Sequence, residues 1–282
     1  MIIWLASYPK SGNTLLRSIL AAYFYSEDGV VKFKDLYNIE QFPEIKHFRD
    51  LKIDLSNEKK VFENFINAQI NINKKNNNLK FLKTHSSLAK VNGCNFTDLK
   101  NTYAAIYIVR DPRNVVSSFA HHYNLKINDA TEAMLDPGRW IAKNDLVFKT
   151  FLSSWNMNYN SWKQLKEKVL FVKYEDLIFK KKNTLIKIFK FIQNLGAEGF
   201  QLNMLKLNKV IKSSDFKIMQ ELEKKDDFQE GILEEGSKKR KIFFRLGPKN
   251  DWRTNLDEKN RLIIEKAFQK EMLELGYLNS KE

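Results

Sequence analysis

The stretch IIWLASYPKSGNTLLRSILAAYF, residues 2–24, determines the predicted fold. Its opening residues 2–6 are uniformly apolar, which indicates a short buried strand. A polar loop follows at 7–13, and after it the apolar residues recur at helical spacing. A buried strand, a loop and an amphipathic helix in this order are typical of an α/β fold.

Apolar runs and helical patterns alternate along the rest of the chain, without an internal repeat or a long Pro-, Gly- or Ser-rich linker. We therefore expect one α/β domain over residues 1–282, with a central parallel sheet flanked by helices in a P-loop-like arrangement. The further predicted strands are 79–84, 103–109 and 169–172. One predicted helix begins at Pro112, and helices dominate 183–222 and 256–275. Residues 27–78 are expected to form helices and loops on one side of the sheet.

The composition narrows the cellular setting and the class of partner. No apolar run reaches the roughly 18 residues that a membrane span needs, and no basic segment precedes the first apolar run as in a signal peptide. The single cysteine, Cys94, cannot form an internal disulfide, so we expect a cytoplasmic protein. The net charge of +14 favours an anionic partner such as nucleic acid, a membrane surface or a phosphorylated small molecule; the alternative is a lysine-rich composition whose lysines are solvated surface residues.

The loop YPKSGNT, residues 8–14, has the features of a phosphate site. It precedes a predicted helix, whose backbone N–H groups and dipole favour an anion. Gly12 lets the backbone approach an anion closely, and Lys10 adds a full charge. Ser11 and Thr14 add hydroxyl donors. The loop is not a Walker A sequence, because its lysine precedes the glycine. A capped helix start with a surface lysine is the plainer alternative.

Arg110 follows the predicted strand 103–109, at the edge where open parallel sheets bind ligands. A structural salt bridge is the alternative role for this arginine. Asp111 and Pro112 suit the first positions of the next helix. Ser118 lies in that helix, but the spacing does not fix its distance from Arg110.

His85 follows the predicted strand 79–84, which is a suitable place for proton transfer. His47, His121 and His122 are weaker candidates, and we expect the last two to divide between the surface and the packing of one helix.

Three other features have open interpretations. Residues 244–253, FRLGPKNDWR, follow the basic run 238–241 and are expected to form a mobile loop that closes over an anion or merely connects two elements. Lys180, Lys181 and Lys182 are expected to be a solvated helix start. The aromatic residues Trp140, Trp155, Tyr159 and Trp162 are expected in the core, with a role in a binding pocket as the alternative.

Together these segments resemble the cytosolic-type sulfotransferases that use 3′-phosphoadenosine 5′-phosphosulfate (PAPS). The resemblance extends from residue 4 to about residue 255, nearly the whole chain. Its six segments are YPKSG at 8–12, KTH at 83–85, Arg110 with Ser118, KYEDL at 173–177, FKIM at 216–219 and RLGPKNDW at 245–252.

The resemblance implies a role for each matching position. His85 would be the general base, Lys10 would stabilise the leaving phosphate oxygen, and Lys83 would hold the sulfuryl oxygens. The 5′-phosphosulfate would be bound by Lys10, Ser11, Gly12, Asn13 and Thr14. The 3′-phosphate would be bound by Arg110, Ser118, Arg245 and the backbone around Leu246 and Gly247. The adenine would lie among Leu15, Tyr174, Ser214 and Phe216.

The chain departs from the family pattern at several of these positions. Leu15 replaces a tryptophan, and Leu246 replaces a lysine that contacts phosphate. Asn13 replaces a threonine, and its amide is expected to donate in place of the hydroxyl. Asn250 replaces a glycine, which asparagine tolerates if φ is positive. His85 is followed by two serines instead of Leu-Pro.

The predicted function is transfer of the sulfuryl group of PAPS to a hydroxyl or amine of an unidentified small-molecule, carbohydrate or lipid acceptor, with release of 3′-phosphoadenosine 5′-phosphate (PAP). No metal and no nucleic-acid partner is expected. Residues 27–78, 124–160 and 223–243 are expected to shape the acceptor site. The alternatives are a nucleotide phosphotransferase and a non-catalytic module that binds nucleotide or nucleic acid. The sequence does not indicate an oligomeric state.

Overall fold

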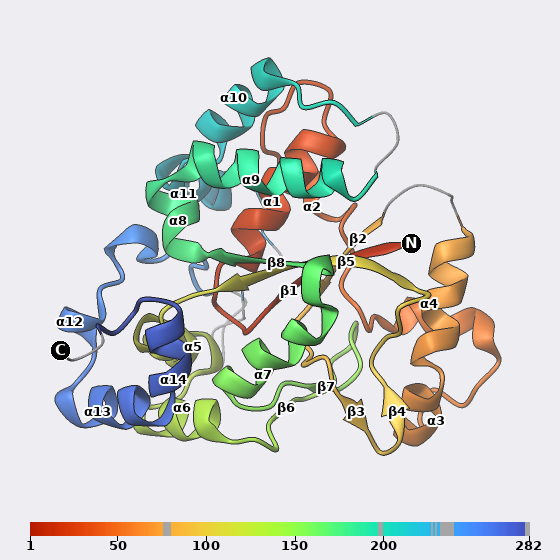
Figure 1. Ribbon diagram of the computed structural model, residues 1–282, viewed down its shortest axis with the longest axis horizontal. Helices are drawn as coiled ribbons and strands as arrows, with labels where there is room; N and C mark the ends of the chain where they lie inside the picture. The colour runs from red at the N-terminus through yellow and green to blue at the C-terminus, as the bar shows by residue number, and fades with distance from the viewer. Residues whose placement is uncertain (76–79, 197–199, 227, 229, 232–239, 280–282) are drawn as a thin grey trace.

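A four-stranded parallel sheet forms the centre of the computed structural model, which describes residues 1–75, 80–196, 200–226, 228, 230–231 and 240–279 (Figure 1). The strand order is β2-β1-β5-β8, and all three neighbouring pairs are parallel. The predicted strands and their parallel arrangement are confirmed; Leu79, the first residue of one of them, lies outside the described residues. The strands are β1 (Ile2–Ser7), β2 (Lys80–Thr84), β5 (Thr102–Val109) and β8 (Val169–Lys173).

The two faces of the sheet enter two separate apolar cores, because successive side chains of a strand point to opposite faces. From β1, Ile3 and Leu5 belong to one core, whereas Ile2 and Trp4 belong to the other. Helices cover both cores, so the molecule has three layers, α/β/α (Figure 1).

The helices of the first core lie above the sheet in Figure 1, and those of the second lie mainly below it or to its right. The first core packs against α1 (Asn13–Phe24), α2 (Phe33–Leu36), α8 (Tyr174–Phe179), α9 (Lys181–Asn194), α10 (Met204–Ser213) and α11 (Phe216–Lys225). The second packs against the 3-10 helices η1 (Ile45–Leu51) and η2 (Lys163–Lys168) and against α3 (Glu58–Glu63), α4 (Phe65–Lys74), α5 (Pro112–Tyr123), α6 (Ile127–Leu135), α7 (Trp155–Trp162), α13 (Glu258–Ala267) and α14 (Gln269–Glu274).

Short elements complete the described chain. They are the two-residue strands β3 (Lys90–Val91), β4 (Cys94–Asn95), β6 (Trp140–Ile141) and β7 (Thr150–Phe151), the 3-10 turn η3 (Gly247–Lys249) and the helix α12 (Trp252–Asn255).

The segment 27–78 covers both faces of the sheet, so the expectation that it covers one side is wrong. Phe33 belongs to the first core and Phe48 to the second. Between them the chain passes the edge of the sheet, where Lys83 of β2 exchanges backbone hydrogen bonds of 2.8 Å with Glu40 and Phe42. This crossing uses the open edge of β2 and leads the segment from one layer to the other.

Trp155, Tyr159 and Trp162 are buried in the second core, which confirms the prediction that they are core residues. Trp140 lies outside this cluster and packs against Phe62 and Phe151.

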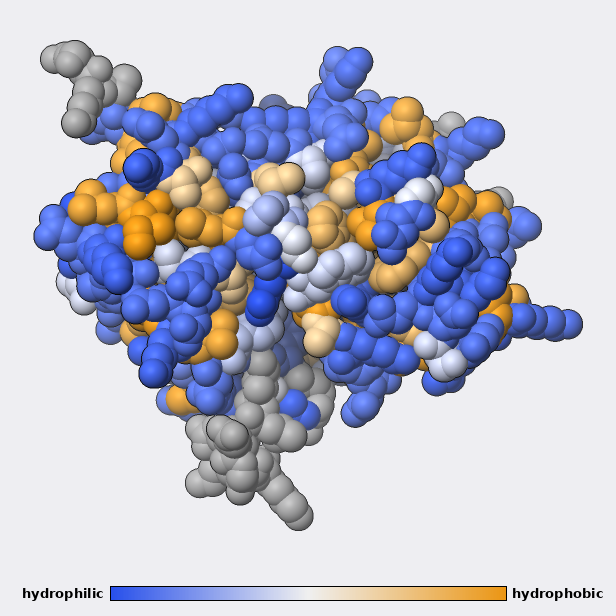
Figure 2. Space-filling view, turned by 90° about the horizontal axis from the view of Figure 1, so that it is seen from below, coloured by the Kyte–Doolittle hydropathy of each residue, from blue (hydrophilic) through white to orange (hydrophobic). Residues whose placement is uncertain are grey.

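The surface seen in Figure 2 is mostly hydrophilic, and its apolar side chains form separate small patches. Of the helices in the described ranges, none combines the length and the apolar character that crossing a bilayer requires.

Candidate active site

The loop between β1 and α1 turns around two residues with positive φ, Lys10 at 66° and Gly12 at 102°. A Cβ on Gly12 would lie 2.4 Å from a ring carbon of Tyr174, so both the backbone angle and the close approach require glycine. Gly12 is the N-cap residue of α1 and has no side chain with which to cap it. The first N–H groups of α1 therefore remain for another acceptor.

Asn13 is directed into the protein, so the expectation that its amide donates to a phosphate is wrong. Its Nδ2 donates to the carbonyl oxygen of Leu5 at 2.9 Å and to Ser7 Oγ at 3.1 Å. An amide nitrogen has two hydrogens, and both are used. Asn13 therefore holds the loop against the end of β1.

Arg110 lies directly after β5 and is 6% exposed. One guanidinium nitrogen, Nη1, donates to the carbonyl oxygen of Lys10 at 3.1 Å, and the guanidinium carbon lies 4.3 Å from the ring centroid of Tyr174. In the described part of the chain Arg110 has no carboxylate partner, and its buried Nε has no hydrogen-bond partner. The neighbouring Arg113 has the structural role instead, because it pairs with Asp111 and Glu265, each at 2.7 Å. Arg110 is thus a buried cation whose charge is available to a ligand.

The segment from Phe244 to Asn250 joins the site through several contacts and is not a solvated connector. Gln220 of α11 donates to the carbonyl oxygen of Phe244 at 2.7 Å. Gly247 has a φ of 50°, and a Cβ there would lie 2.1 Å from the ring of Phe216, so the ring covers this backbone directly. The part of the basic run at 238 and 239 lies outside the described residues.

Asn250 stands where the family has a glycine, but its backbone does not adopt the positive φ expected for such a position. Its φ is −75°, and the side chain is buried against α5. There its amide contacts both Ser117 and Ser118, each at 3.1 Å. Ser118 and Arg110, whose proximity the spacing left open, line the same cavity.

The tautomer of His85 follows from its contacts. Its Nδ1 lies 2.9 Å from the carbonyl oxygen of Ser7, and a carbonyl only accepts, so Nδ1 carries the hydrogen. The lone pair is then on Nε2. Burial, and after it the charge of Lys83, lowers the pKa of His85 to about 3, so the ring is neutral at ordinary pH.

The serines that replace Leu-Pro after His85 fix the backbone in another way. Ser87 Oγ donates to the carbonyl oxygen of Leu152 at 2.6 Å, and Trp162 donates to that of Ser86 at 3.1 Å. The departure from the family pattern therefore leaves His85 on a well-bonded segment.

Two lysines line the cavity, Lys83, which is buried, and Lys10, which is half-buried. Burial lowers the pKa of Lys10 to about 7, although Glu230 acts in the opposite direction. Its Nζ lies 3.8 Å from the ring centroid of Phe243. Burial also lowers the pKa of Lys83. An anion bound beside these lysines would raise both pKa values.

Glu230 is the site residue that the sequence did not indicate. Its carboxylate accepts from Thr14 Oγ1 at 2.6 Å, pairs with Arg17, and lies 3.7 Å from Lys83 Nζ. Burial alone would raise the pKa of Glu230, but Lys83 and Arg17 outweigh burial and the pKa falls below its ordinary value. The local signal was Arg17, the one charged residue of helix α1.

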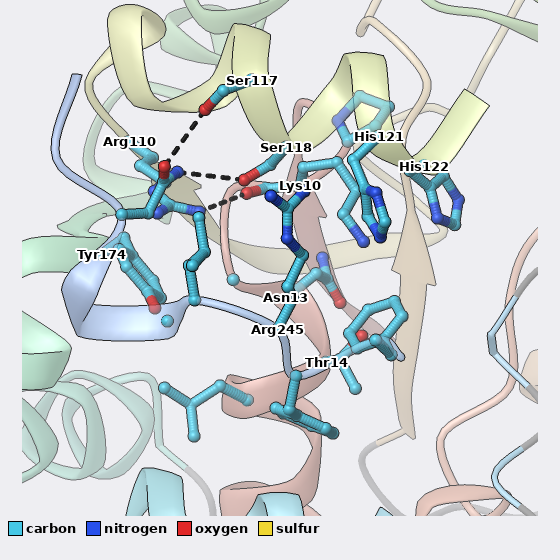
Figure 3. A pocket seen from close by; sticks show the side chains of 18 of the residues that line it. Lys10, Asn13, Thr14, Arg110, Ser117, Ser118, His121, His122, Tyr174 and Arg245 are labelled. Carbon is cyan, nitrogen blue, oxygen red and sulfur yellow. Dashed lines mark hydrogen bonds between the residues drawn. The ribbon is translucent and has the colours of Figure 1, made fainter. Parts of the chain in front are cut away.

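His121 and His122 both line the cavity, so the expected division between surface and packing is wrong (Figure 3). Burial, followed by the charge of Lys10, lowers the pKa of His122 to about 3.

Lys181, which was expected to be part of a solvated helix start, is not simply solvated, because its Nζ donates to the carbonyl oxygen of Ser214 at 2.7 Å.

A single cavity of about 410 Å³ brings together every predicted site residue except Ser11. Ser11 is fully buried behind the loop, and its Oγ has no partner within the described ranges. The predicted residues that line the cavity are Lys10, Gly12, Asn13, Thr14, Leu15, Lys83, His85, Arg110, Ser118, Tyr174, Ser214, Phe216, Arg245, Leu246 and Gly247.

The family profile described as "Sulfotransferase domain" matches residues 2–276. The chain belongs to the sulfotransferase family. The resemblance carried by the six sequence segments is thereby confirmed, and so is the prediction of an enzyme of this class.

Known sulfotransferases are distant relatives of the chain. Mouse sulfotransferase 1 family member D1 is 24% identical over 276 residues, which cover 96% of this chain and 83% of that protein. The 3-beta-hydroxysteroid sulfotransferase of Cavia porcellus is 26% identical over 172 residues, which cover 59% of this chain and only 55% of that protein.

Two solved structures share the fold. A mouse sulfotransferase complexed with PAP has a TM-score of 0.58 at 21% identity, covering 96% of this chain and 83% of that one. Retinol dehydratase in complex with androsterone and PAP has a TM-score of 0.60 at 17% identity, covering 100% of this chain and 82% of that one. Both of these structures contain PAP.

Among the residues that the structure describes, no group of three or more His, Cys, Asp and Glu side chains is arranged to hold a metal ion.

Proposed function

We propose that the protein transfers the sulfuryl group of PAPS to a hydroxyl, or an amine, of a small-molecule acceptor and releases PAP. The observation that carries this proposal is the single cavity in which Lys10, Lys83 and His85 lie together with Arg110 and Ser118. The cavity has two groups of anion-binding residues, which suit a nucleotide with two phosphate groups. It also has a neutral imidazole, which can accept a proton.

The residues present fit such a nucleotide. Arg110 Nε is a buried donor that lacks a partner in the described part of the chain, which is costly unless a ligand satisfies it. At Gly12 and Gly247 aromatic rings lie so close to the backbone that a Cβ would collide with them. The rings of Tyr174 and Phe216 thus provide apolar surfaces beside the two polar loops.

We assign the 5′ end of PAPS to Lys10, Thr14 and the first N–H groups of α1. Ser11 is not part of the cavity lining, so its hydroxyl reaches the nucleotide only if the loop adjusts. The 3′-phosphate is assigned to Arg110, Ser118 and Arg245 with the backbone at Gly247. The adenine is assigned to the space between Tyr174 and Phe216, beside Leu15 and Ser214.

PAPS supplies an activated sulfuryl group, and the side chains handle proton and charge. His85 Nε2 takes the proton of the acceptor as the new bond from the acceptor oxygen to sulfur forms. Lys10 neutralises the charge that develops on the phosphate oxygen as the old sulfur–oxygen bond breaks, and Lys83 holds the sulfuryl oxygens. Such positioning and charge stabilisation carry most of the rate in comparable in-line displacements.

The low pKa of His85 is compatible with this role. A value of about 3 in the free protein keeps Nε2 unprotonated and available. An anionic nucleotide beside Lys83 offsets the charge of that lysine and raises the basicity of His85.

The acceptor is assigned to the part of the cavity near His85. Tyr123, Ile127 and Phe243 are apolar residues of the cavity lining, and an apolar lining suits an acceptor with an apolar body. Of the three stretches expected to shape the acceptor site, 223–243 contributes several lining residues and 124–160 contributes Ile127, whereas 27–78 contributes none within the described residues.

A transfer assay tests the proposed function. The protein is incubated with sulfur-labelled PAPS and, separately, a phenol, a sterol and an aliphatic amine. We expect label in at least one acceptor, with one PAP formed for each label transferred. Labelled free sulfate alone, or transfer of phosphate from ATP to these acceptors, would contradict the proposal.

A further inference from the structure

Asn250 is a buried polar residue of the cavity lining to which no nucleotide contact is assigned above. It follows η3, lines the cavity, and is 6% exposed. Its side chain crosses from the loop that contains Gly247 to helix α5 and forms hydrogen bonds with three residues there, Asn114, Ser117 and Ser118.

The side-chain amide of Asn250 is fully used. Nδ2 donates to the carbonyl oxygen of Asn114 at 2.8 Å and to Ser118 Oγ at 3.1 Å. Oδ1 accepts from Ser117 Oγ at 3.1 Å. Because the carbonyl of Asn114 can only accept, the amide nitrogen must face it, and the orientation of the amide is fixed.

This arrangement determines the direction of the Ser118 hydroxyl. A serine in a helix commonly donates to the carbonyl four residues earlier, which for Ser118 is the carbonyl of Asn114. Asn250 occupies that carbonyl and also donates to Ser118 Oγ. Within the described ranges, the hydrogen of Ser118 is left with no acceptor, and the side chain lines the cavity.

The two neighbouring serines therefore differ. The hydrogen of Ser117 is directed to Asn250 Oδ1 at 3.1 Å and to the carbonyl of Asn114 at 3.2 Å, so it stays within the protein. The hydrogen of Ser118 is free for a ligand, and Arg110 lines the same cavity. A hydroxyl donor together with a guanidinium is suited to a phosphate.

We infer that Asn250 is a positioning residue that presents the Ser118 hydroxyl as a donor to the 3′-phosphate and so determines the preference for 3′-phosphorylated nucleotides. This inference rests on the proposed function, because it requires a 3′-phosphate at Arg110 and Ser118. Asn250 does not itself contact the phosphate, since both hydrogens of its amide are already used.

Calorimetric titrations with PAP and with 5′-AMP, which lacks the 3′-phosphate, test the inference. The proteins compared are the unsubstituted chain, Asn250→Ala, Ser118→Ala, the double variant and Ser117→Ala. We expect Asn250→Ala and Ser118→Ala each to weaken PAP binding about tenfold to a hundredfold, as for one hydrogen bond to a charged group, with 5′-AMP binding unchanged. In the double variant the loss is expected to equal that of one substitution, because both remove the same donor. Ser117→Ala is the matched control and is expected to leave both affinities unchanged.

The outcomes separate the two proposals. Equal affinity of the unsubstituted protein for PAP and 5′-AMP would contradict the proposed function and this inference with it. A preference for PAP that persists in Asn250→Ala, or losses that add fully in the double variant, would contradict only the role of Asn250. If Asn250→Ala does not fold, Asn250→Asp serves instead. Its carboxylate accepts a hydrogen bond from Ser118 and so turns the Ser118 hydrogen away from the phosphate. A preference for PAP that persists in Asn250→Asp would also contradict the role of Asn250.

Discussion

The carboxylate of Glu230 accepts a hydrogen bond of 2.6 Å from the hydroxyl of Thr14. The same carboxylate pairs with Arg17 and lies 3.7 Å from Lys83. Thr14 and Lys83 are residues to which we assign the 5′-phosphosulfate. In the free protein a carboxylate of the chain itself therefore uses donors that the nucleotide requires.

Glu230→Gln is expected to bind PAP about tenfold more tightly, because a neutral amide competes less with phosphate for Thr14 and the lysines; tenfold corresponds to about 1.4 kcal/mol. The free variant is expected to unfold more easily, by about 1–3 kcal/mol, since Arg17 loses its charged partner. Titration calorimetry and thermal unfolding measure the two effects. Glu221→Gln, at an exposed position of α11, is the control. Weaker PAP binding in Glu230→Gln would show that Glu230 supports the bound state instead.

Arg110→Ala and Arg113→Ala are expected to affect different properties, the first nucleotide affinity and the second stability. The first removes a buried cation without a carboxylate partner in the described residues, so it should weaken PAP binding by about 2–3 kcal/mol with little change in stability. The second breaks the buried pair with Asp111, so it should reduce stability by about 3–5 kcal/mol. Calorimetry and denaturant unfolding distinguish them. Unchanged PAP affinity in Arg110→Ala would remove this residue from the site.

His85→Ala is expected to reduce turnover about 10²–10⁴-fold, the usual contribution of a general base. PAP affinity should change little, because His85 is assigned to the acceptor's proton and not to the nucleotide. Steady-state assays at saturating PAPS measure the first effect and calorimetry the second. His122→Ala is the comparison, since it removes a second cavity imidazole. Full turnover in His85→Ala with loss in His122→Ala would transfer the role of base to His122.

The pKa of about 7 at Lys10 predicts that PAP binding depends on pH. Above that pH the free protein loses the Lys10 proton, which the bound phosphate requires, so affinity should fall by up to about tenfold per pH unit, with proton uptake on binding. His85 and His122, with pKa values of about 3, stay neutral across this range. Calorimetry between pH 6 and 9 in buffers of different ionisation enthalpy measures affinity and proton uptake. A pH-independent affinity would contradict a lowered Lys10 pKa.

The lysine also affects stability, with a defined sign. Its folded pKa of about 7 lies below the ordinary value of 10.5, so between these values the unfolded chain binds more protons. The contribution of Lys10 therefore makes the free protein more stable as pH rises through this window. Lys10→Arg, which does not titrate, should lack the contribution.

Features that depend on neighbouring residues were predictable from the sequence. The loop 8–14 stands between an apolar strand and an amphipathic helix, and the structure has both elements there. Asp111 was predicted as an N-cap, and its side chain accepts from the backbone N–H of Arg113 at 3.0 Å. Parallel strands end at the same edge of a sheet, so Arg110 and the loop 8–14 were expected on that edge.

Features that depend on contacts between distant residues were not predictable in this way. Glu230 reaches Thr14 across 216 positions of sequence, and it lies in a polar stretch without a recognisable motif. Asn13 was expected to face a phosphate, but its amide finds acceptors on β1. For Asn250 the sequence prediction concerned only the backbone angle φ, whereas the side-chain contacts with α5 determine its conformation. In each case a side chain selects among several available partners, and only the packed structure determines which one lies within reach.

The most direct test of the account is a calorimetric titration of the purified protein with PAP, beside 5′-AMP and ATP with Mg²⁺. It needs no knowledge of the acceptor. We predict micromolar binding of PAP without metal, and clearly weaker binding of the other two nucleotides. A preference for ATP with Mg²⁺ over PAP, or no binding of PAP at all, would contradict the assignment of this cavity to PAPS.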